Sequence, residues 1–142
     1  MKVSLLLIGL IFISGWNFQT HQDIVESVYY SLNNISYLNL TTLKYGAIVP
    51  DKVFRDHRLH SYPKSYINGL KWLNETKNAL KNHDYNNASY AFGIATHYIA
   101  DSFSAPHNIK GESSRLHAMY ENQASVVYDY VNCKKYEYEL NK

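Results

Sequence analysis

Apolar side chains recur every three or four residues along most of this chain, and no segment shows the alternation of apolar and polar residues that is typical of a strand. The spacing predicts five helices, over about 21–38, 40–45, 63–82, 85–103 and 113–131. Pro63 suits the first turn of the third helix, whereas Pro50 and Pro106 interrupt helical backbone. We therefore expect an all-α fold, a single-domain bundle of about five helices with one loop over residues 46–62.

The first residues have the composition of a secretory signal: Lys2, then an almost unbroken apolar run over 3–13, then two small residues. A helix that spans a bilayer needs about 20 apolar residues, so this run is too short for a transmembrane helix. We expect residues 1–15 to be a signal peptide that is removed on export. The result is a secreted, extracellular protein with one domain over 16–142, and Trp16 is its first residue.

The cysteine and charge counts narrow the classes of function. Cys133 is the single cysteine among 142 residues, which excludes an intramolecular disulfide and a zinc site built from paired cysteines. The chain has 14 Lys and Arg against 12 Asp and Glu, and so lacks the basic excess expected of a protein that holds nucleic acid by charge alone. Seven histidines in such a chain instead indicate a metal bound by imidazole and carboxylate groups.

Two pairs of such groups have helical spacing. His97 and Asp101 are four residues apart on the fourth predicted helix, and His117 and Glu121 are four apart on the fifth. Residues at this spacing share one helical face, so each pair can close on one ion. A single pair of this kind is more often part of a solvated or salt-bridged face. Two pairs, with His107 after a helix-breaking proline between them, favour a metal site.

Further candidate ligands lie upstream. His21 opens the first predicted helix, and His60 closes the loop that contains Asp51 and Asp56. If both histidines join the others, five of the seven lie at one pole of the bundle. Helical bundles that carry histidine and carboxylate ligands on facing helices often hold more than one ion. The residues alone therefore predict a multi-metal hydrolase, with zinc, manganese and iron all compatible with the ligands.

The same residues resemble a known family. The strings HYIADSFSAPH at 97–107 and HAMYE at 117–121 are similar to the zinc signature shared by bacterial zinc-dependent phospholipase C and the fungal single-strand nucleases, and their spacing matches the phospholipase branch. Trp16 and His21 correspond to the tryptophan that begins the mature chains of the family and to the histidine on their first helix. The segment GAIVPDKVFRDHRLHSYP resembles the loop that supplies one Asp and one His.

The resemblance implies a full set of zinc ligands within residues 16–121. It implies three zinc ions: the first held by Asp51, His60, His97 and Asp101, the second by His107, His117 and Glu121, and the third by Trp16 and His21 with Asp101 as a bridge. Trp16 would bind through its carbonyl and its free α-amine, which exists only after the signal is removed. Asp51 would orient or deprotonate the attacking water, again by resemblance.

Within the loop, Asp56 and His57 are the alternative to Asp51 and His60. We favour the outer pair, because Asp51 follows Pro50 and His60 begins the family-like HSYP string. Two other residues are given ordinary roles. His83 stands in a polar turn and is expected at the surface, and Trp72 lies on a helical face beside Leu73 and is expected to be a core or half-buried residue.

The expected activity is that of a secreted zinc phosphodiesterase of the phospholipase C type, which cleaves a phospholipid to diacylglycerol and a phosphorylated head group. The alternatives are a single-strand nuclease or 3′-nucleotidase on the same three ions, and a truncated zinc-binding domain without catalysis. As partners we expect a phospholipid or another phosphodiester substrate, transient contact with a membrane surface, and no stable nucleic-acid partner. We expect the protein to be a monomer.

Overall fold

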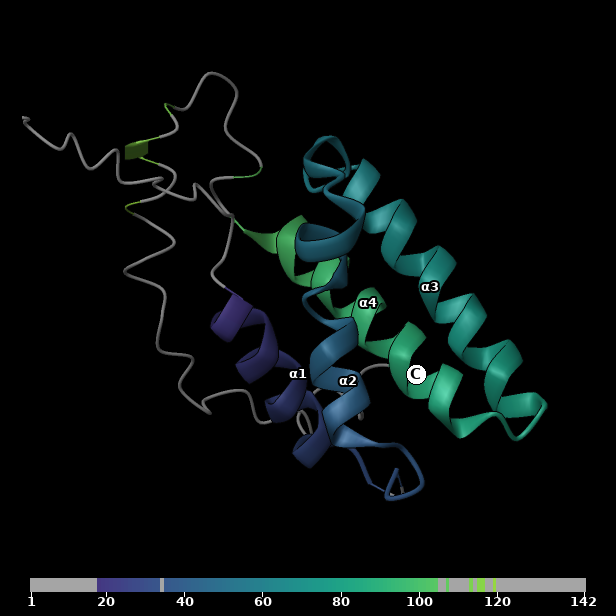
Figure 1. Cartoon of the computed structure of the whole chain (residues 1–142). Coiled ribbons are helices and arrows are strands. Elements are labelled where there is room, and N and C mark those ends of the chain that lie inside the picture. Colours follow the sequence, from purple (N-terminus) through teal and green to yellow (C-terminus); the bar gives the residue numbers. More distant parts are fainter. Residues whose placement is uncertain are drawn as a thin grey trace, which may run out of the picture.

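The structure, a computed structural model, describes residues 18–33, 35–104, 107, 113, 115, 116 and 119. In this part of the chain it contains four α-helices and two short helical turns: α1 (Phe18–Ser31), α2 (Leu40–Gly46), η1 (Pro50–Phe54), η2 (His57–Leu59), α3 (Lys64–Lys81) and α4 (Tyr85–Phe103) (Figure 1). The described residues form no strand, which confirms the predicted all-α fold. Among them, no helix combines the length and the apolar character needed to cross a membrane.

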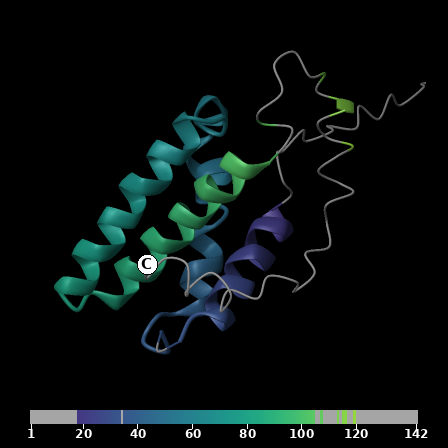
Figure 2. The ribbon, with the colours of Figure 1, turned by 180° about the vertical axis from the view of Figure 1, so that it is seen from behind.

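The central element of the bundle is α4. Figures 1 and 2 show α3 running along one side of it, while α1 and α2 lie on the other side. Small side chains allow this close packing, since Ala88, Ala91 and Ala95 are all buried. A β-carbon on Gly93 would collide with the carbonyl oxygen of Leu43, so glycine is required where α2 crosses α4.

The core consists of two apolar clusters that lie along α4. The first joins α1, α2 and α4 through Val25, Leu43 and Ala88. The second joins η1 to α4 through Val49, Ile94 and Tyr98, and the half-buried Trp72 packs against it. The predicted role of Trp72 is therefore confirmed. The two clusters fix the position of α4 against the segment that follows α2.

Three of the predicted helices have nearly the predicted bounds. The structure gives Leu40–Gly46, Lys64–Lys81 and Tyr85–Phe103, against predicted ranges of 40–45, 63–82 and 85–103. The side chain of Asp84 caps α4 by accepting a hydrogen bond from the backbone N–H of Asn87. The predicted helix over 113–131 lies almost entirely outside the described residues.

Two expectations about the first half of the chain were wrong. The first helix ends at Ser31, whereas the prediction carried it to Leu38. Ile35 and Leu38 still pack on the first cluster, but they do so from a turn in which the N–H of Leu38 donates to the carbonyl of Ile35. Apolar side chains at helical spacing thus continue past Ser31, so the spacing alone could not predict where the first helix ends.

The second correction concerns the predicted loop. Residues 46–62 contain η1, a π-helical turn, and η2, a 3₁₀ turn, instead of wholly irregular backbone. Pro50 is the first residue of η1, where its missing N–H costs no internal hydrogen bond. 3₁₀ turns are frequent connectors, whereas π-helical turns are rare and often occur at functional sites. Here they bring two polar side chains to the C-terminal half of α4.

Candidate metal centre

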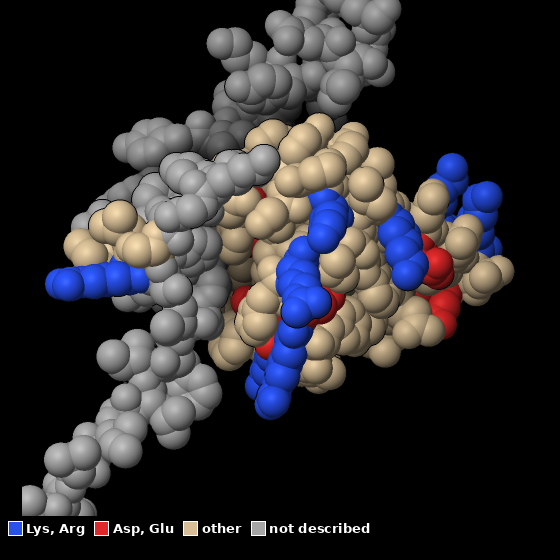
Figure 3. Space-filling view, turned by 90° about the horizontal axis from the view of Figure 1, so that it is seen from above, with Lys and Arg blue, Asp and Glu red and all other residues tan. Residues whose placement is uncertain are grey.

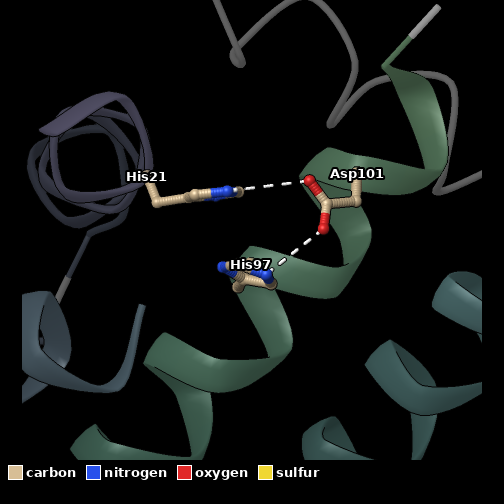
Figure 4. A group of neighbouring side chains, drawn as sticks. All are labelled: His21, His97 and Asp101. Carbon is tan, nitrogen blue, oxygen red and sulfur yellow. Dashed lines mark ion pairs between the residues drawn. The ribbon is translucent and has the colours of Figure 1, made fainter. Parts of the chain in front are cut away.

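The centre of the site is one turn of α4. His97 and Asp101 are both fully buried, and Nε2 of His97 lies 3.2 Å from Oδ2 of Asp101 (Figure 4). Their spacing of four residues puts them on the same face of the helix, as the sequence predicted. Because both lie inside the regular part of α4, the helix backbone itself fixes how far apart they stand.

The ring of His97 is oriented from outside α4. Its Nδ1–H donates a 2.7 Å hydrogen bond to the carbonyl oxygen of Ala47, which follows α2. This bond determines the tautomer and leaves Nε2 facing Asp101. A backbone carbonyl that holds the second ring nitrogen is a common way to orient a metal-binding histidine. The contact also attaches the end of α2 to the site.

His21 reaches the same carboxylate from α1. Its Nε2 lies 3.6 Å from Oδ1 of Asp101, and its ring stacks on that of His97 with centroids 3.8 Å apart (Figure 4). Burial, followed by the charge of His97, lowers the pKa of His21 well below its ordinary value. The neutral imidazole is therefore the favoured form, and this is the form that binds metal ions.

The segment between α2 and α3 supplies Asp51 and His60. Asp51 lies in η1 and His60 directly after η2, and both are buried. Nδ1 of His60 lies 2.9 Å from Oδ2 of Asp101 and 3.5 Å from Oδ1 of Asp51. Nε2 of His97 lies 3.9 Å from the same Asp51 oxygen. The structure thus brings the favoured loop pair together with the pair on α4.

The alternative loop pair lies differently. His57 is exposed, whereas Asp56 lies behind His60, with its Oδ1 3.0 Å from Nε2 of His60. The hydroxyl of Tyr98 donates a hydrogen bond to the other oxygen of Asp56. Burial, together with this hydrogen bond, raises the pKa of Tyr98, so the hydroxyl keeps its proton. Asp56 and Tyr98 therefore hold the outer side of His60.

Sequence reasoning missed this arrangement. It treated Asp56 only as an alternative to Asp51, and it gave Tyr98 no role beyond helix packing. One signal was available, because Asp56 and His60 are four residues apart and Tyr98 directly follows His97. The spacing could be interpreted only if residues 56–60 were known to form a turn that packs against α4. Predicted as irregular loop, the segment gave no reason to pair Asp56 with either residue.

His107 completes the described cluster. Its Nε2 lies 3.4 Å from Oδ1 of Asp101, and its ring centroid is 6.0 Å from that of His60. Four histidine side chains therefore surround one carboxylate. Three groups of residues could each hold one ion, because within each group one ligand atom per residue lies within 4.8 Å of the others. The groups are His21, His97 and Asp101; Asp51, His60 and His97; and His60, Asp101 and His107.

The pKa values of the two buried carboxylates in the cluster are shifted in opposite directions. Burial raises the pKa of Asp51, and the nearby histidines only partly offset this. Burial would also raise the pKa of Asp101, but the charge of His97 and the hydrogen bond from His60 outweigh it and hold the pKa well below its usual range. Burial alone would lower the pKa of His60, whereas Asp101 and Asp51 raise it to about 9.

The donor set fits a divalent transition metal. Neither oxygen of the buried Asp51 carboxylate has a hydrogen-bond partner among the described residues. A buried carboxylate without hydrogen-bond donors is costly, and a cation would remove that cost. Imidazole nitrogens with carboxylate oxygens are suitable ligands for zinc, as well as for manganese and iron.

Some predicted site residues lie outside the described part of the chain. They are Trp16, His117 and Glu121, together with the predicted signal peptide. His83, expected at the surface, is exposed, and its Nδ1 contacts the hydroxyl of Tyr85. Of the predicted ligands that are described, His21, Asp51, His60, His97, Asp101 and His107 all meet in the cluster.

Comparison with known families gives one match. The model of a family described as zinc dependent phospholipase C matches residues 20–142. The matched range includes all the described residues of the cluster. No curated protein and no solved structure gave a significant match to the chain.

Proposed function

The chain belongs to the zinc-dependent phospholipase C family, and from this premise we propose that it cleaves a phospholipid to diacylglycerol and a phosphorylated head group. Membership by itself makes the protein a zinc hydrolase of this family. The observation that carries the proposal is the buried cluster in which four histidines and Asp51 surround Asp101. A purely structural domain has no need to bury so many ionisable side chains around one carboxylate.

We assign the zinc ligands as follows. Within the described residues they are His21, Asp51, His60, His97, Asp101 and His107, and outside them Trp16, His117 and Glu121 complete the set by resemblance to the family. Full occupancy is three ions. Bound zinc supplies a water with a pKa of about 7 and stabilises the negative charge that develops on the phosphoryl oxygens.

Asp51 is the proposed general base. Its carboxylate lies at the edge of the cluster, lacks hydrogen-bond partners among the described residues, and has a raised pKa because it is buried. A carboxylate with a raised pKa accepts a proton more readily, whereas Asp101, with its lowered pKa, stays ionised. Asp51 takes a proton from the water as the water oxygen forms a bond to phosphorus, the P–O bond to diacylglycerol breaks, and the alkoxide that leaves takes up a proton from solvent water, to which Asp51 returns its own.

The other residues position this pair. Asp56 and Tyr98 hold His60 from outside, and the carbonyl of Ala47 orients His97. His60 and His97 both lie near Asp51 and Asp101, so their fixed rings determine how the two carboxylates face the reacting groups. Removal of the signal peptide would free the amine of Trp16, and export would therefore be coupled to completion of the site.

One set of measurements tests the proposal. Purified mature protein is analysed for bound metal and N-terminal sequence, and is then offered phospholipid vesicles, single-stranded nucleic acid and a chromogenic phosphodiester. We expect zinc, a start at Trp16, and release of diacylglycerol. Hydrolysis of nucleic acid without any hydrolysis of phospholipid would replace this function with that of a nuclease. Bound zinc without turnover of any ester would indicate a non-catalytic domain.

The role of Asp51 has a sharper test. Asp51→Asn keeps the shape of the side chain but removes both the base and a proposed zinc ligand, so zinc content is measured beside the rate. General-base catalysis contributes about 10²–10⁴-fold to a rate. We expect kcat to fall by that factor on the chromogenic ester. Asp23→Asn is the matched control, because Asp23 is a half-buried residue of α1 outside the cluster, and its Oδ1 accepts a hydrogen bond from Nε2 of Gln19. Equal rates for the two variants would exclude Asp51 as the base.

A further inference from the structure

A surface beside the metal cluster carries side chains that the proposed chemistry leaves unused. Three of them are largely exposed apolar residues: Val53 (53%), Tyr62 (62%) and Ile67 (60%). The same stretch has four exposed cations, and we group three of them with these apolar residues: Lys52, Arg58 and Lys64. These six residues come from η1, from η2, from the link after η2 and from the start of α3, and we call them the loop face.

The loop face adjoins the site through the backbone. Lys52 and Val53 directly follow Asp51, and Tyr62 stands two residues after His60. The end of α4 has the same pattern, because Phe103, which is 82% exposed, stands two residues after Asp101. Each of these three segments thus passes from the buried cluster to an exposed apolar side chain within two residues.

The loop face also has a net positive charge. Residues 50–70 contain four Lys and Arg and two acidic residues, Asp51 and Asp56. Both acids are turned inward, Asp51 into the cluster and Asp56 toward His60 and Tyr98. Lys52, Arg58 and Lys64 form no ion pair with any described residue. Figure 3, which looks down on this end of the bundle, shows a row of Lys and Arg on a surface that is mostly uncharged, with a few Asp and Glu side chains beside the row.

Exposed aliphatic side chains among unpaired cations fit one kind of partner. A lipid surface accepts apolar groups at the level of its head groups, and anionic head groups attract Lys and Arg. Single-stranded nucleic acid is held by aromatic stacking, to which Val53 and Ile67 cannot contribute. We propose that the loop face docks the protein onto an anionic phospholipid surface. The inference rests on the proposed function, since docking there would bring the metal cluster to its lipid substrate.

Vesicle binding can be measured separately from hydrolysis. The protein is sedimented with vesicles of phosphatidylcholine alone and with vesicles of equal parts phosphatidylcholine and phosphatidylglycerol, at low and high salt. Turnover of a soluble chromogenic phosphodiester is measured on the same samples. We expect binding to the anionic vesicles that weakens as salt rises, because screening reduces the attraction between the cations and the head groups.

Two variants divide the loop face into its charged and apolar parts. Lys52→Gln, Arg58→Gln and Lys64→Gln in one chain should weaken binding to anionic vesicles by about 100-fold, since each cation near a lipid surface contributes about 1 kcal/mol. The control removes three exposed cations from the later turns of α3, as Lys71→Gln, Lys77→Gln and Lys81→Gln. This control should bind as the wild type does.

The apolar part is tested with Val53→Ser and Ile67→Ser in one chain. We expect about tenfold weaker binding to both kinds of vesicle. The effect is modest because each of these side chains is already partly covered by the protein and therefore moves only part of its apolar surface from water into the lipid. Tyr30→Ser and Leu32→Ser, at the end of α1, remove exposed apolar groups of similar size from the other end of the bundle. Soluble-ester turnover should stay unchanged in all four variants, which shows that the folded site is intact.

The outcomes separate this inference from the proposed function. Turnover of esters without vesicle binding would overturn the inference and leave the function standing. Vesicle binding that depends on the loop face, without turnover of any ester, would support the inference and contradict the function. Equal loss of binding in the charge variant and its α3 control would also overturn the inference. So would an oligonucleotide that binds more tightly than the vesicles and displaces them.

Discussion

Two regions of the molecule build the cluster by different means. In α4, His97 and Asp101 are fixed relative to each other by the helix backbone, so their spacing in the sequence already determines their geometry. In the segment 47–62, Asp51 and His60 are separated by eight residues and by two turns of different type, and only contacts with α4 bring them together. The spacing of the α4 pair is set within the helix, and only the orientation of the His97 ring depends on Ala47, whereas the positions of Asp51 and His60 depend entirely on neighbouring elements.

The largest effect should come from the residue that both regions share. Asp101→Asn removes the charge that faces four histidines, three of them buried, and removing one partner of a buried ion pair typically costs about 3–5 kcal/mol. We expect loss of bound zinc and a fall of that size in the free energy of unfolding. Zinc analysis and denaturant titration measure the two. Asp23→Asn again serves as control, and an Asp101 variant with its full zinc content would contradict the central role of this carboxylate.

The next prediction tests the contacts that hold His60, in the connecting segment, against α4. Tyr98→Phe deletes only the hydroxyl that donates to Asp56, so the carboxylate behind His60 is held less firmly while every proposed ligand remains. Groups that hold a ligand in place usually contribute 10–100-fold to metal affinity, and we expect about that loss in zinc affinity. Competition with a chromogenic chelator measures it. Tyr85→Phe, which removes an exposed hydroxyl, should leave the affinity unchanged.

Packing between the two regions can be disturbed without touching the site. A β-carbon on Gly93 would collide with the backbone of α2, so Gly93→Ala should force α2 away from α4. Overpacking of this kind costs about 1–3 kcal/mol in the free energy of unfolding. Gly69→Ala is the comparison, because the atom nearest to its β-carbon would be Cγ1 of the Ile99 side chain, whereas the β-carbon on Gly93 would meet backbone atoms of α2. Similar stabilities for the two variants would mean that α2 adjusts freely.

Zinc affinity should depend on pH through the connecting segment. His60 has a raised pKa of about 9, so in the metal-free protein it carries a proton at neutral pH and must release it to bind zinc. Affinity should therefore rise with pH, by up to about tenfold per pH unit, and level off near pH 9. Chelator competition at several pH values measures the slope. His57→Ala, which removes the exposed neighbour, should keep the slope, and a flat profile in the wild type would contradict the protonated state of His60.

The smallest effect concerns the start of α2, far from the cluster. The side chain of Asn39 accepts a hydrogen bond from the N–H of Thr42, and loss of such a cap costs about 1 kcal/mol. Asn39→Ala should lower the free energy of unfolding by that amount and leave zinc affinity unchanged. Thermal unfolding with and without zinc tests both parts. A change in zinc affinity would mean that a disturbance at the start of α2 reaches His97 through the carbonyl of Ala47.

The same contrast explains how much the sequence could predict. The bounds of α4 and the pairing of His97 with Asp101 followed from helical spacing, because every interaction that sets them is local. The choice of Asp51 and His60 over Asp56 and His57 rested on the position of Asp51 after Pro50 and on the family-like HSYP string, and it stays a prediction; the structure places Asp51 and His60 in the cluster and Asp56 beside His60. What the residues alone could not predict was the place of Asp56 behind His60, since this depends on how η2 packs against Tyr98. The end of α1 was missed for a related reason, because Leu38 stays in the core without being helical.

The three candidate groups in the cluster overlap in a way that limits their simultaneous occupancy. Each pair of groups has one member in common, and these members are His97, His60 and Asp101. An imidazole whose other nitrogen is already engaged has a single lone pair to give, as His97 does beside Ala47 and His60 does beside Asp56. Only the carboxylate of Asp101, with its two oxygens, can serve two ions at once. An ion that takes both His60 and His97 therefore leaves one described histidine to each of its neighbours, and those neighbours must draw their remaining ligands from the rest of the chain.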